Sequence, residues 1–336
     1  MKRYWIAVIF TFIFGTMLAQ DKAKEATEYF EAAMYEKALF IFNELLETYP
    51  KDPYYNYFAG RCLLKLNRNH EQCRKHLFIA STSIGPEDAL FYYAKINHLT
   101  YHLTEAERSL KQFDNQLGFL KKINYNIKET EQHIQNTKNL TTSYMLLEVG
   151  EVKTFKQSHF EDSYNQLETG FKLVRPSQKD FIEYGLVPSY EYPLLIAVNE
   201  DKRKFIIAEK QLNAGKTDIY ELKKHDEFQG IAPEFLGNDV NTRKNEQFAW
   251  WDFENDFLYF SSTGHGGMGG FDIYKSRYNA VRDIWEKPEN VGFPMNSPFD
   301  DFLLPGKSNG KALLVTNRNS ESGILEMYDI SIGSED

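Results

Sequence analysis

The sequence of 336 residues has two cysteines and a single long hydrophobic run. It has no H-E-x-x-H or C-x-x-C motif and no dinucleotide-binding glycine pattern after an expected strand, so zinc-hydrolase, redox and nucleotide sites lack support. Acidic side chains outnumber basic ones by 48 to 39, which gives a net charge of −9 and leaves no basic stripe. We therefore expect neither nucleic acid nor an anionic membrane as a partner.

The two cysteines, Cys62 and Cys73, flank the turn of an expected helical hairpin. Two interpretations stay open: a disulfide in an oxidising compartment, or two small buried side chains. The nearby imidazoles of His70 and His76 repeat no ligand spacing. We expect no metal site and no cofactor.

Residues 1–19 resemble an export signal. Lys2 and Arg3 precede a 13-residue apolar run, residues 6–18, which ends at Ala19. This run is short for a membrane span. We expect export with no direct membrane span in the mature chain, and an uncleaved anchor is the alternative. No cysteine lies near this point, which argues against lipoprotein processing.

Residues 20–113 are expected to form three helical hairpins. Small residues recur 12 positions apart, as at Ala26 and Ala38, and let antiparallel helices approach closely. The three copies are carried by Ala26, Tyr29, Ala38, Phe42 and Pro50; by Gly60, Leu63, Leu77 and Ala80; and by Ala94, Ala106, Leu110 and Phe113. This spacing resembles the tetratricopeptide repeat, which implies an α-helical solenoid. Residues 114–143 are expected to be a capping helix and a linker.

The tetratricopeptide resemblance implies a concave groove lined by the first helix of each hairpin. The repeat register projects five side chains into that groove: Tyr54, Tyr57, Arg61, Phe91 and Lys95. Aromatic rings beside an arginine and a lysine suit the anchoring of a peptide. Packing of the tyrosines within the helical stack is the alternative.

Residues 257–278 read as a strand, a glycine-rich turn and a second strand. The turn carries five glycines, which are expected to supply positive-φ backbone: Gly264, Gly266, Gly267, Gly269 and Gly270. They lead into an extended segment, residues 271–274, that holds Asp272 and Tyr274. A phosphate cradle needs a helix at that point, so we discard it.

This stretch recurs at a spacing of 54 residues. Asp272-Ile273-Tyr274 falls on Asp218-Ile219-Tyr220 in one direction and on Glu326-Met327-Tyr328 in the other. Strand-and-turn repeats of this length are typical of propeller blades. With Trp285, Pro288 and residues 296–301, the run resembles the TolB-type β-propeller repeat.

The resemblance implies an α+β multidomain chain in which an all-β, TolB-like propeller of three or four recognisable blades occupies residues 144–336. Either residues 144–190 form a degenerate fourth blade or the propeller is incomplete. A strand near residues 144–149 is expected to complete the last sheet.

The candidate catalytic groups are not expected to have the geometry that catalysis requires. The G-x-S-x-G pattern at residues 306–310 falls on an expected hairpin turn rather than a strand-to-helix elbow. Asp300 and Asp301 are adjacent and would point to opposite faces of a strand. Asp218 and Asp272 recur at one repeat position, which indicates a repeated structural hydrogen bond. His265 is expected to be a solvated turn residue, and we expect no catalytic residue.

The TolB-type version that this chain resembles occurs in bacterial envelope proteins of type IX secretion and gliding motility. The resemblance implies a non-catalytic interaction scaffold in the periplasm, associated with the outer membrane. Its expected partner is an outer-membrane β-barrel or another subunit of the complex. The sequence shows no OmpA-type C-terminal domain, so attachment to the cell wall is expected to come from a partner. The alternative is a carbohydrate-binding or carbohydrate-active propeller that uses Trp250, Trp251 or Trp285.

Overall fold

The chain divides into two compact units, Met1–Ile134 and Gln135–Asp336, and each is described by itself. The computed structural model describes residues 19–117, 125–142, 147, 149–167, 169, 171–174, 195–199, 205–210, 215–225, 230–306 and 310–331. The expected signal segment therefore lies outside the described residues, apart from Ala19. Within the described ranges, no helix combines the length and apolarity needed to cross a membrane.

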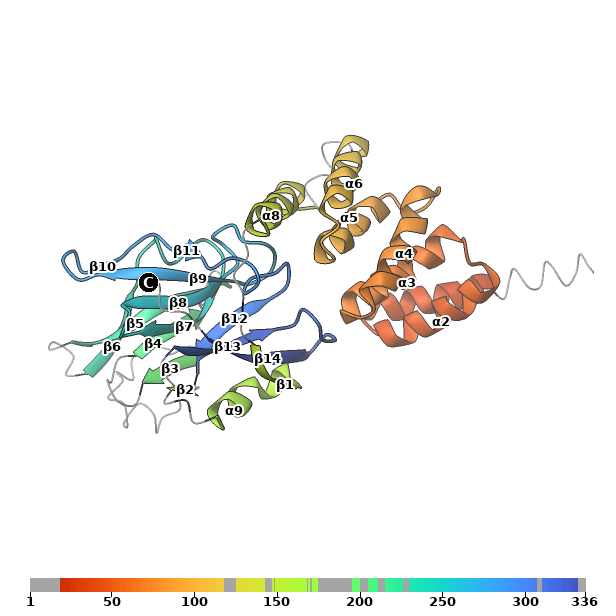
Figure 1. Cartoon of the computed structure of the whole chain (residues 1–336). Helices are drawn as coiled ribbons and strands as arrows, with labels where there is room; N and C mark the ends of the chain where they lie inside the picture. The colour runs from red at the N-terminus through yellow and green to blue at the C-terminus, as the bar shows by residue number, and fades with distance from the viewer. Residues whose placement is uncertain are drawn as a thin grey trace, which may run out of the picture. The chain divides into compact units, whose positions relative to one another are not determined.

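The first unit is helical, as predicted. A helix over residues 19–31 is followed by α2 (Tyr35–Thr48), α3 (Pro53–Leu66), α4 (His70–Thr82), α5 (Ala89–Leu99) and α6 (Leu103–Gln116). The next helix, α8 (Ile127–Leu140), begins in the first unit, and its residues from Gln135 onward belong to the second unit. Successive helices from α2 to α6 pack side by side with short connections (Figure 1). The helical hairpins are thus confirmed, whereas their membership in the tetratricopeptide family stays a prediction.

Local chemistry sets the ends of α3. The Asp52 carboxylate accepts hydrogen bonds from the backbone N–H groups of Tyr54 and Tyr55, both at 2.9 Å, and so caps the helix. Pro53 occupies the first turn, where no N–H is needed. Asn67 ends the helix in the left-handed conformation at φ 50°.

Small residues hold the helices together where the 12-residue spacing places them. Ala26, Ala38, Ala94 and Ala106 have no exposed surface, and a Cβ on Gly60 would lie 2.7 Å from Cγ of Leu77. The large partner side chains fill the space beside these close contacts. Among those partners, Phe42, Leu63, Leu77, Leu110 and Phe113 are buried.

Cys62 and Cys73 are free, buried thiols in this structure. The thiol of Cys73 donates a hydrogen bond of 3.1 Å to the carbonyl of Gly60. Burial raises the pKa of each thiol to about 12. They therefore pack as small side chains between α3 and α4, which is the second of the two interpretations above.

The second unit contains three antiparallel sheets. Their orders are β2-β3-β4-β5-β6, then β7-β8-β9-β10 with β11 also on β9, and β1-β14-β13-β12. The strands are β1 (Val149–Lys156), β2 (Phe171–Val174), β3 (Leu195–Asn199), β4 (Phe205–Lys210), β5 (Thr217–His225), β6 (Gly230–Phe235), β7 (Glu246–Asp252), β8 (Phe257–Ser262), β9 (Asp272–Asn279), β10 (Ile284–Trp285), β11 (Glu289–Asn290), β12 (Asp301–Pro305), β13 (Lys311–Thr316) and β14 (Ile324–Ser331).

The 54-residue repeat corresponds to a three-stranded meander. Asp218, Asp272 and Glu326 lie near the starts of β5, β9 and β14, the third strands of the three meanders. Each meander also gains an outer strand: β6 pairs with β5, β10 with β9, and β1 with β14. Among the described residues these sheets do not form a closed propeller, so a TolB-type identity stays a prediction.

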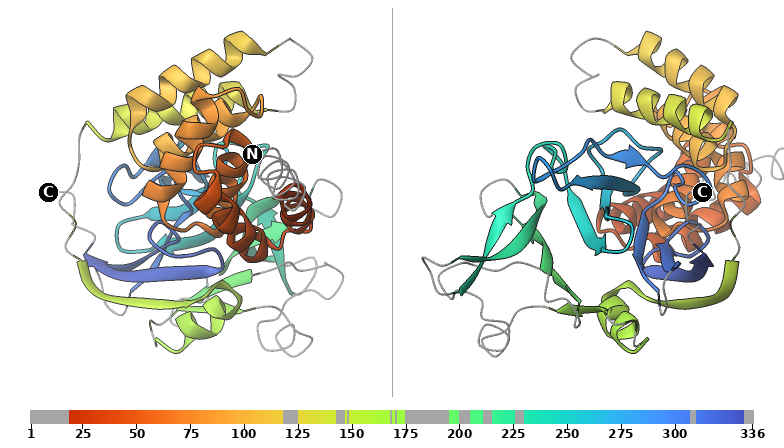
Figure 2. Two further views of the ribbon diagram at one scale, coloured as in Figure 1. Left: turned by 90° about the vertical axis from the view of Figure 1, so that its right-hand side faces the viewer. Right: turned by 60° about the vertical axis from the view of Figure 1, so that its left-hand side comes forward.

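The last sheet is completed by a strand from the start of the unit. β1 lies antiparallel to β14 with Phe155 opposite Leu325, although about half the chain separates them (Figure 2). The prediction that a strand from the start of the unit completes the last sheet is confirmed, but this strand begins at Val149. The expected position, residues 144–149, falls mostly outside the described residues.

The interpretation of residues 144–190 as a fourth blade is wrong for the part that the structure describes. β1 and β2 join two different sheets, and a helix that the sequence did not indicate, α9 (Phe160–Asn165), lies between them in the chain. Phe160 and Tyr164 lie four residues apart on one face of α9. Both are buried in a cluster with Phe302 and Leu325.

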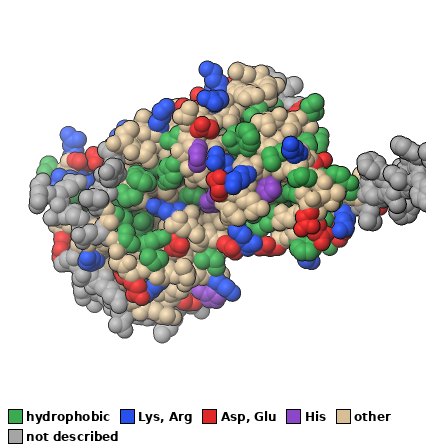
Figure 3. Space-filling view, turned by 45° about the vertical axis from the view of Figure 1, so that its right-hand side comes forward, with side chains coloured by type: hydrophobic (Ala, Val, Ile, Leu, Met, Phe, Trp, Pro, Cys, Tyr) green, Lys and Arg blue, Asp and Glu red, His purple; other side chains and the backbone are tan. Residues whose placement is uncertain are grey.

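Charged side chains of both signs are interspersed over the face of the molecule that Figure 3 shows. Such mixing is ordinary for a protein surface. It gives no broad single-sign field on that face, so charged sites have to be sought residue by residue.

We expect Gly60→Val to destabilise the helical unit. The new side chain would overlap Leu77 at its branch point, 2.7 Å from the Cβ position, and overpacking of this kind costs about 2 kcal/mol. Asn43→Val, at an exposed position of α2, is the control and should change the free energy of unfolding by less than about 0.5 kcal/mol. Urea unfolding followed by circular dichroism measures both. Equal stabilities for the two variants would contradict the close helix contact.

Candidate functional site

The glycine-rich turn is shaped mainly by close contacts. Of its five glycines only Gly266 has a positive φ, 80°, so the expectation of positive φ throughout is wrong. At the other four, a neighbouring group fills the space of a side chain. A Cβ would lie 1.8 Å from Thr242 Oγ1 at Gly264, 2.0 Å from Asp272 Oδ2 at Gly267, 2.1 Å from the Pro298 carbonyl at Gly269, and 2.2 Å from Asp300 Oδ1 at Gly270.

Asp272 anchors this turn from inside. Its carboxylate is 1% exposed and accepts the backbone N–H groups of Met268 at 3.0 Å and Gly269 at 3.2 Å. Burial raises the pKa of Asp272 to about 7, because desolvation outweighs the two N–H donors. Tyr274 is buried beside it, and burial also raises the pKa of its phenol.

The outer side of the turn is held by the last two turns of α8. The Asn136 amide donates to the carbonyls of Gly266 and Gly267, the latter at 3.1 Å. The Thr137 hydroxyl donates to the carbonyl of Met268 at 3.3 Å. The turn's N–H groups and carbonyls are thus bonded from opposite sides.

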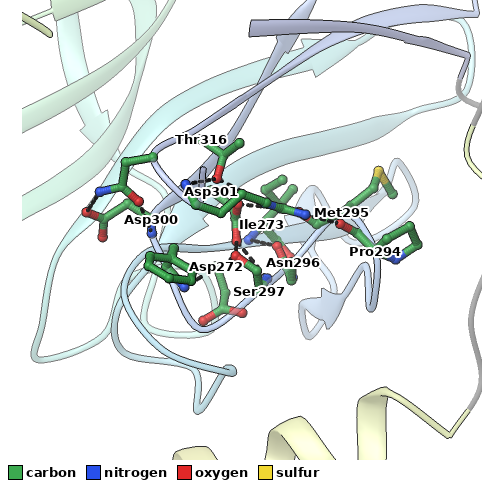
Figure 4. A network of polar contacts seen from close by, with 12 residues as sticks. Asp272, Ile273, Pro294, Met295, Asn296, Ser297, Asp300, Asp301 and Thr316 are labelled. Carbon is green, nitrogen blue, oxygen red and sulfur yellow. Dashed lines mark hydrogen bonds and ion pairs between the residues drawn. The ribbon is translucent and has the colours of Figure 1, made fainter. Parts of the chain in front are cut away.

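A second turn, residues 296–301, forms the network drawn in Figure 4. The Asn296 amide accepts the N–H of Ile273 at 2.7 Å and donates to the carbonyl of the same residue at 2.8 Å. The backbone N–H and the hydroxyl of Ser297 donate to Asp301 at 2.6 and 2.7 Å. This segment therefore ties β9 to the start of β12.

Arg318 completes the network. Its guanidinium makes an ion pair of 2.5 Å with Asp301, which is fully buried. It also donates to the carbonyls of Pro294 and Met295, both at 2.7 Å. The neighbouring Asp300 has other partners and accepts the N–H of Phe271 at 3.0 Å. The two adjacent carboxylates thus serve different contacts, in line with the sequence argument.

The same arrangement occurs one repeat earlier, at residues 241–246. The Asn241 amide accepts from the N–H of Ile219 at 2.7 Å and donates to its carbonyl at 2.9 Å. Glu246 accepts from the N–H and the hydroxyl of Thr242 at 3.1 and 2.7 Å. We call residues 241–246 and 296–301 the repeat turns.

The remaining candidates from the sequence are also used internally. Asp218 and Asp272 are both buried, but Asp218 accepts from Lys216 Nζ at 2.7 Å, so the partner differs between the repeats. The interpretation of His265 as a solvated residue is wrong, because its ring packs on Phe260 and Tyr274 and its Nε2 lies 2.8 Å from the Val240 carbonyl.

Neither the tryptophans nor the G-x-S-x-G pattern has the surroundings that a sugar-binding or nucleophile site needs. Trp250, Trp251 and Trp285 are 6%, 4% and 6% exposed, so they pack in the core and cannot stack on a sugar. The G-x-S-x-G pattern joins two strands, since β12 and β13 pair around it. Its central residues 307–309 lie outside the described residues.

In the helical unit, a second polar cluster surrounds Arg61. Its guanidinium lies over the rings of Phe30, Tyr57 and Tyr92, with centroids at 4.8, 5.2 and 4.2 Å, and donates to the Tyr57 hydroxyl at 2.8 Å. That hydroxyl donates to Asp88 at 2.7 Å. Burial raises the pKa of Tyr57 far above its ordinary range, with the Asp88 hydrogen bond acting in the same direction. We call Phe30, Tyr57, Arg61, Asp88 and Tyr92 the Arg61 cluster.

The structure places the five predicted groove residues in different environments. Tyr54 is 53% exposed, whereas Tyr57 and Phe91 are 4% and 5% exposed. Tyr57 therefore packs within the stack, as the alternative for the tyrosines allowed, and Phe91 does so as well. Arg61 is half-buried, and Lys95 is exposed with its ammonium 5.0 Å from the Phe91 ring centroid.

The sequence argument missed several network residues. The Asn241 turn repeats the Asn296 turn at a spacing of 55 residues, a signal that a search at 54 overlooks. Arg318 and Asp88 have no local signal, since their partners come from other elements.

No protein-family model and no curated protein matches this chain. In the part of the chain that the structure describes, no three His, Cys, Asp or Glu side chains gather as metal ligands. Function therefore has to be argued from the chain's own residues.

We expect Asn296→Ala and Asn241→Ala each to lower the free energy of unfolding by about 2–3 kcal/mol. Each change leaves a buried backbone N–H and carbonyl of the preceding strand without the amide that now bonds both. Asn319→Ala, which removes an exposed amide, should be nearly neutral. Chemical denaturation monitored by tryptophan fluorescence tests this, and a neutral Asn296→Ala would show that the amide is dispensable.

Stability should also fall as pH rises from about 4 to about 7. The pKa of Asp272 is about 7 in the folded chain against an ordinary value of 3.8. Its contribution is therefore complete below the ordinary value and is lost as pH rises through about 7. Burial raises the pKa of Glu246 in the same direction. Asp272→Asn should flatten the dependence of melting temperature on pH between about 4 and 7. Parallel curves for both proteins would contradict this assignment.

Proposed function

We propose that this protein is a non-catalytic interaction scaffold of a bacterial cell envelope, and that it docks other proteins of a type IX secretion or gliding complex. The expected export segment and the resemblance of residues 257–301 to envelope propellers support the location. The expected partner is an outer-membrane β-barrel or another subunit of the complex.

The main support for the proposal is a contrast between the two units: the second unit buries its carboxylates in internal hydrogen bonds, whereas the helical unit exposes aromatic and cationic side chains. In the second unit, Asp218, Glu246, Asp272 and Asp301 are each at most 1% exposed and accept hydrogen bonds from the chain itself. In the helical unit, Tyr54 is half exposed, Lys95 is exposed and Arg61 is half-buried, and all three belong to the expected groove register. Exposed aromatic and cationic side chains are typical anchors of protein recognition.

The carbohydrate alternative gains no specific support, because the three tryptophans that it requires are buried.

Affinity purification of the tagged chain from detergent-solubilised envelopes tests the scaffold. We expect Tyr54→Ala to reduce recovery of the partner about tenfold, since loss of an exposed aromatic anchor costs more than 1 kcal/mol. Phe40→Ala removes an equally large exposed ring, 66% exposed, from α2 and should leave recovery unchanged. Recovery of the chain alone, or equal effects of both changes, would contradict the proposal.

A further inference from the structure

Two stripes of side chains meet on the helical unit. On α3, Tyr57, Arg61 and Lys65 are spaced four residues apart and share one face of the helix. On α5, Phe91 and Lys95 have the same spacing. The stripes adjoin, because the Arg61 guanidinium lies 4.2 Å from the ring centroid of Tyr92 on α5.

The nearby acids do not pair with these cations. The two carboxylate oxygens of Asp88 accept hydrogen bonds from the hydroxyls of Tyr57 and Tyr125, at 2.7 and 3.2 Å. Glu129 lies 4.0 Å from His133 on α8. Within the described ranges, Arg61, Lys65 and Lys95 have no carboxylate within 4.0 Å.

The cations also act on one another. Although the Lys95 side chain as a whole is exposed, partial desolvation of its ammonium lowers the pKa of Lys95; the positive charges of Lys65 and Arg61 add to the effect, and Glu129 opposes it. The Nε atom of Arg61 is buried and has no hydrogen-bond partner among the described residues. A partly desolvated guanidinium interacts more strongly with an anion than a fully hydrated one does.

We propose that the surface formed by Arg61, Lys65 and Lys95 binds an extended acidic segment of a partner protein through its carboxylates. This inference rests on the proposed scaffold function and names the chemistry of its partner. Carboxylates in a peptide are complementary to these unpaired cations, and the exposed Tyr54 ring at the start of α3 gives the segment an apolar contact.

The spacing favours a peptide over a single compact anion. Arg61 and Lys65 are four residues apart, about 6 Å along the helix axis, and Lys95 stands on a second helix. The three charges therefore lie on two adjoining helices, where successive carboxylates of one peptide can meet them. A nucleic acid is disfavoured because the chain as a whole carries a net charge of −9.

Fluorescence anisotropy with the full chain tests the proposal. The probe is a labelled, amidated peptide in which glutamate alternates with serine, and the comparison peptide has glutamine in place of every glutamate. We expect the acidic peptide to bind more tightly, with an affinity that falls as salt is added. A free-acid version of each peptide reports whether a terminal carboxylate adds to binding. Equal binding of the glutamine peptide would overturn the proposal.

Variants locate the site. Lys65→Gln combined with Lys95→Gln removes two exposed charges without altering the rings around Arg61, and should weaken the acidic peptide about fivefold. Lys111→Gln, at an exposed position of α6, is the charge-matched control and should leave binding unchanged. An equal loss in the control, or no loss in the double variant, would overturn the site. Circular dichroism of both variants checks that the helix content of the chain is unchanged.

The outcomes separate this inference from the scaffold function. If the double variant recovers the envelope partner normally while Tyr54→Ala does not, the scaffold stands and the acidic segment is wrong. If no envelope partner is recovered by any form of the chain, the scaffold itself fails. Tighter binding of inorganic phosphate or duplex DNA than of the acidic peptide would also overturn the proposal.

Discussion

The need to satisfy buried backbone groups at the ends of the strands governs the second unit. Near the starts of β5 and β9, the backbone N–H groups and carbonyls of Ile219 and Ile273 are buried and cannot reach water. Asn241 and Asn296 meet this need with an amide that both accepts and donates at one residue of the preceding strand. Each buried group left without a partner costs about 1–3 kcal/mol, a large share of the marginal stability of a domain.

The glycine-rich turn follows from the same constraint. Gly267 approaches the carboxylate of Asp272, and Gly270 approaches that of Asp300, so closely that no Cβ fits. The sequence showed that glycine mattered here, but the expected reason, positive φ, holds only at Gly266. Backbone contacts between distant segments cannot be read from a local pattern, so the physical cause of a glycine becomes visible only in three dimensions.

The strands were predictable because each meander repeats both its alternation and its length. The repeat turns were not, because their spacing is 55 residues while that of the strands is 54. The connection from Ile273 to Asn296 is one residue longer than that from Ile219 to Asn241. The register shift between Gln247 and Trp250 in β7, where Phe248 has φ 52°, adds one residue to the earlier repeat and so restores the 54-residue spacing in the strands that follow. The contacts of Arg318, β1 and the Arg61 cluster could not be predicted for another reason, because their partners are distant in the sequence.

Binding and stability therefore depend on different side chains. The buried carboxylates near the glycine-rich turn are bonded to backbone or to Arg318, so a change at any of them alters the fold before it alters a surface. Lys65 and Lys95 are exposed and make no ion pair within the described ranges, so their charges can be removed with little effect on packing. Arg61 stands between these cases, because its guanidinium supports three rings while Tyr57 links it to Asp88. A loss of binding on changing Arg61 alone would thus mix packing with recognition, whereas the two lysines report recognition by itself.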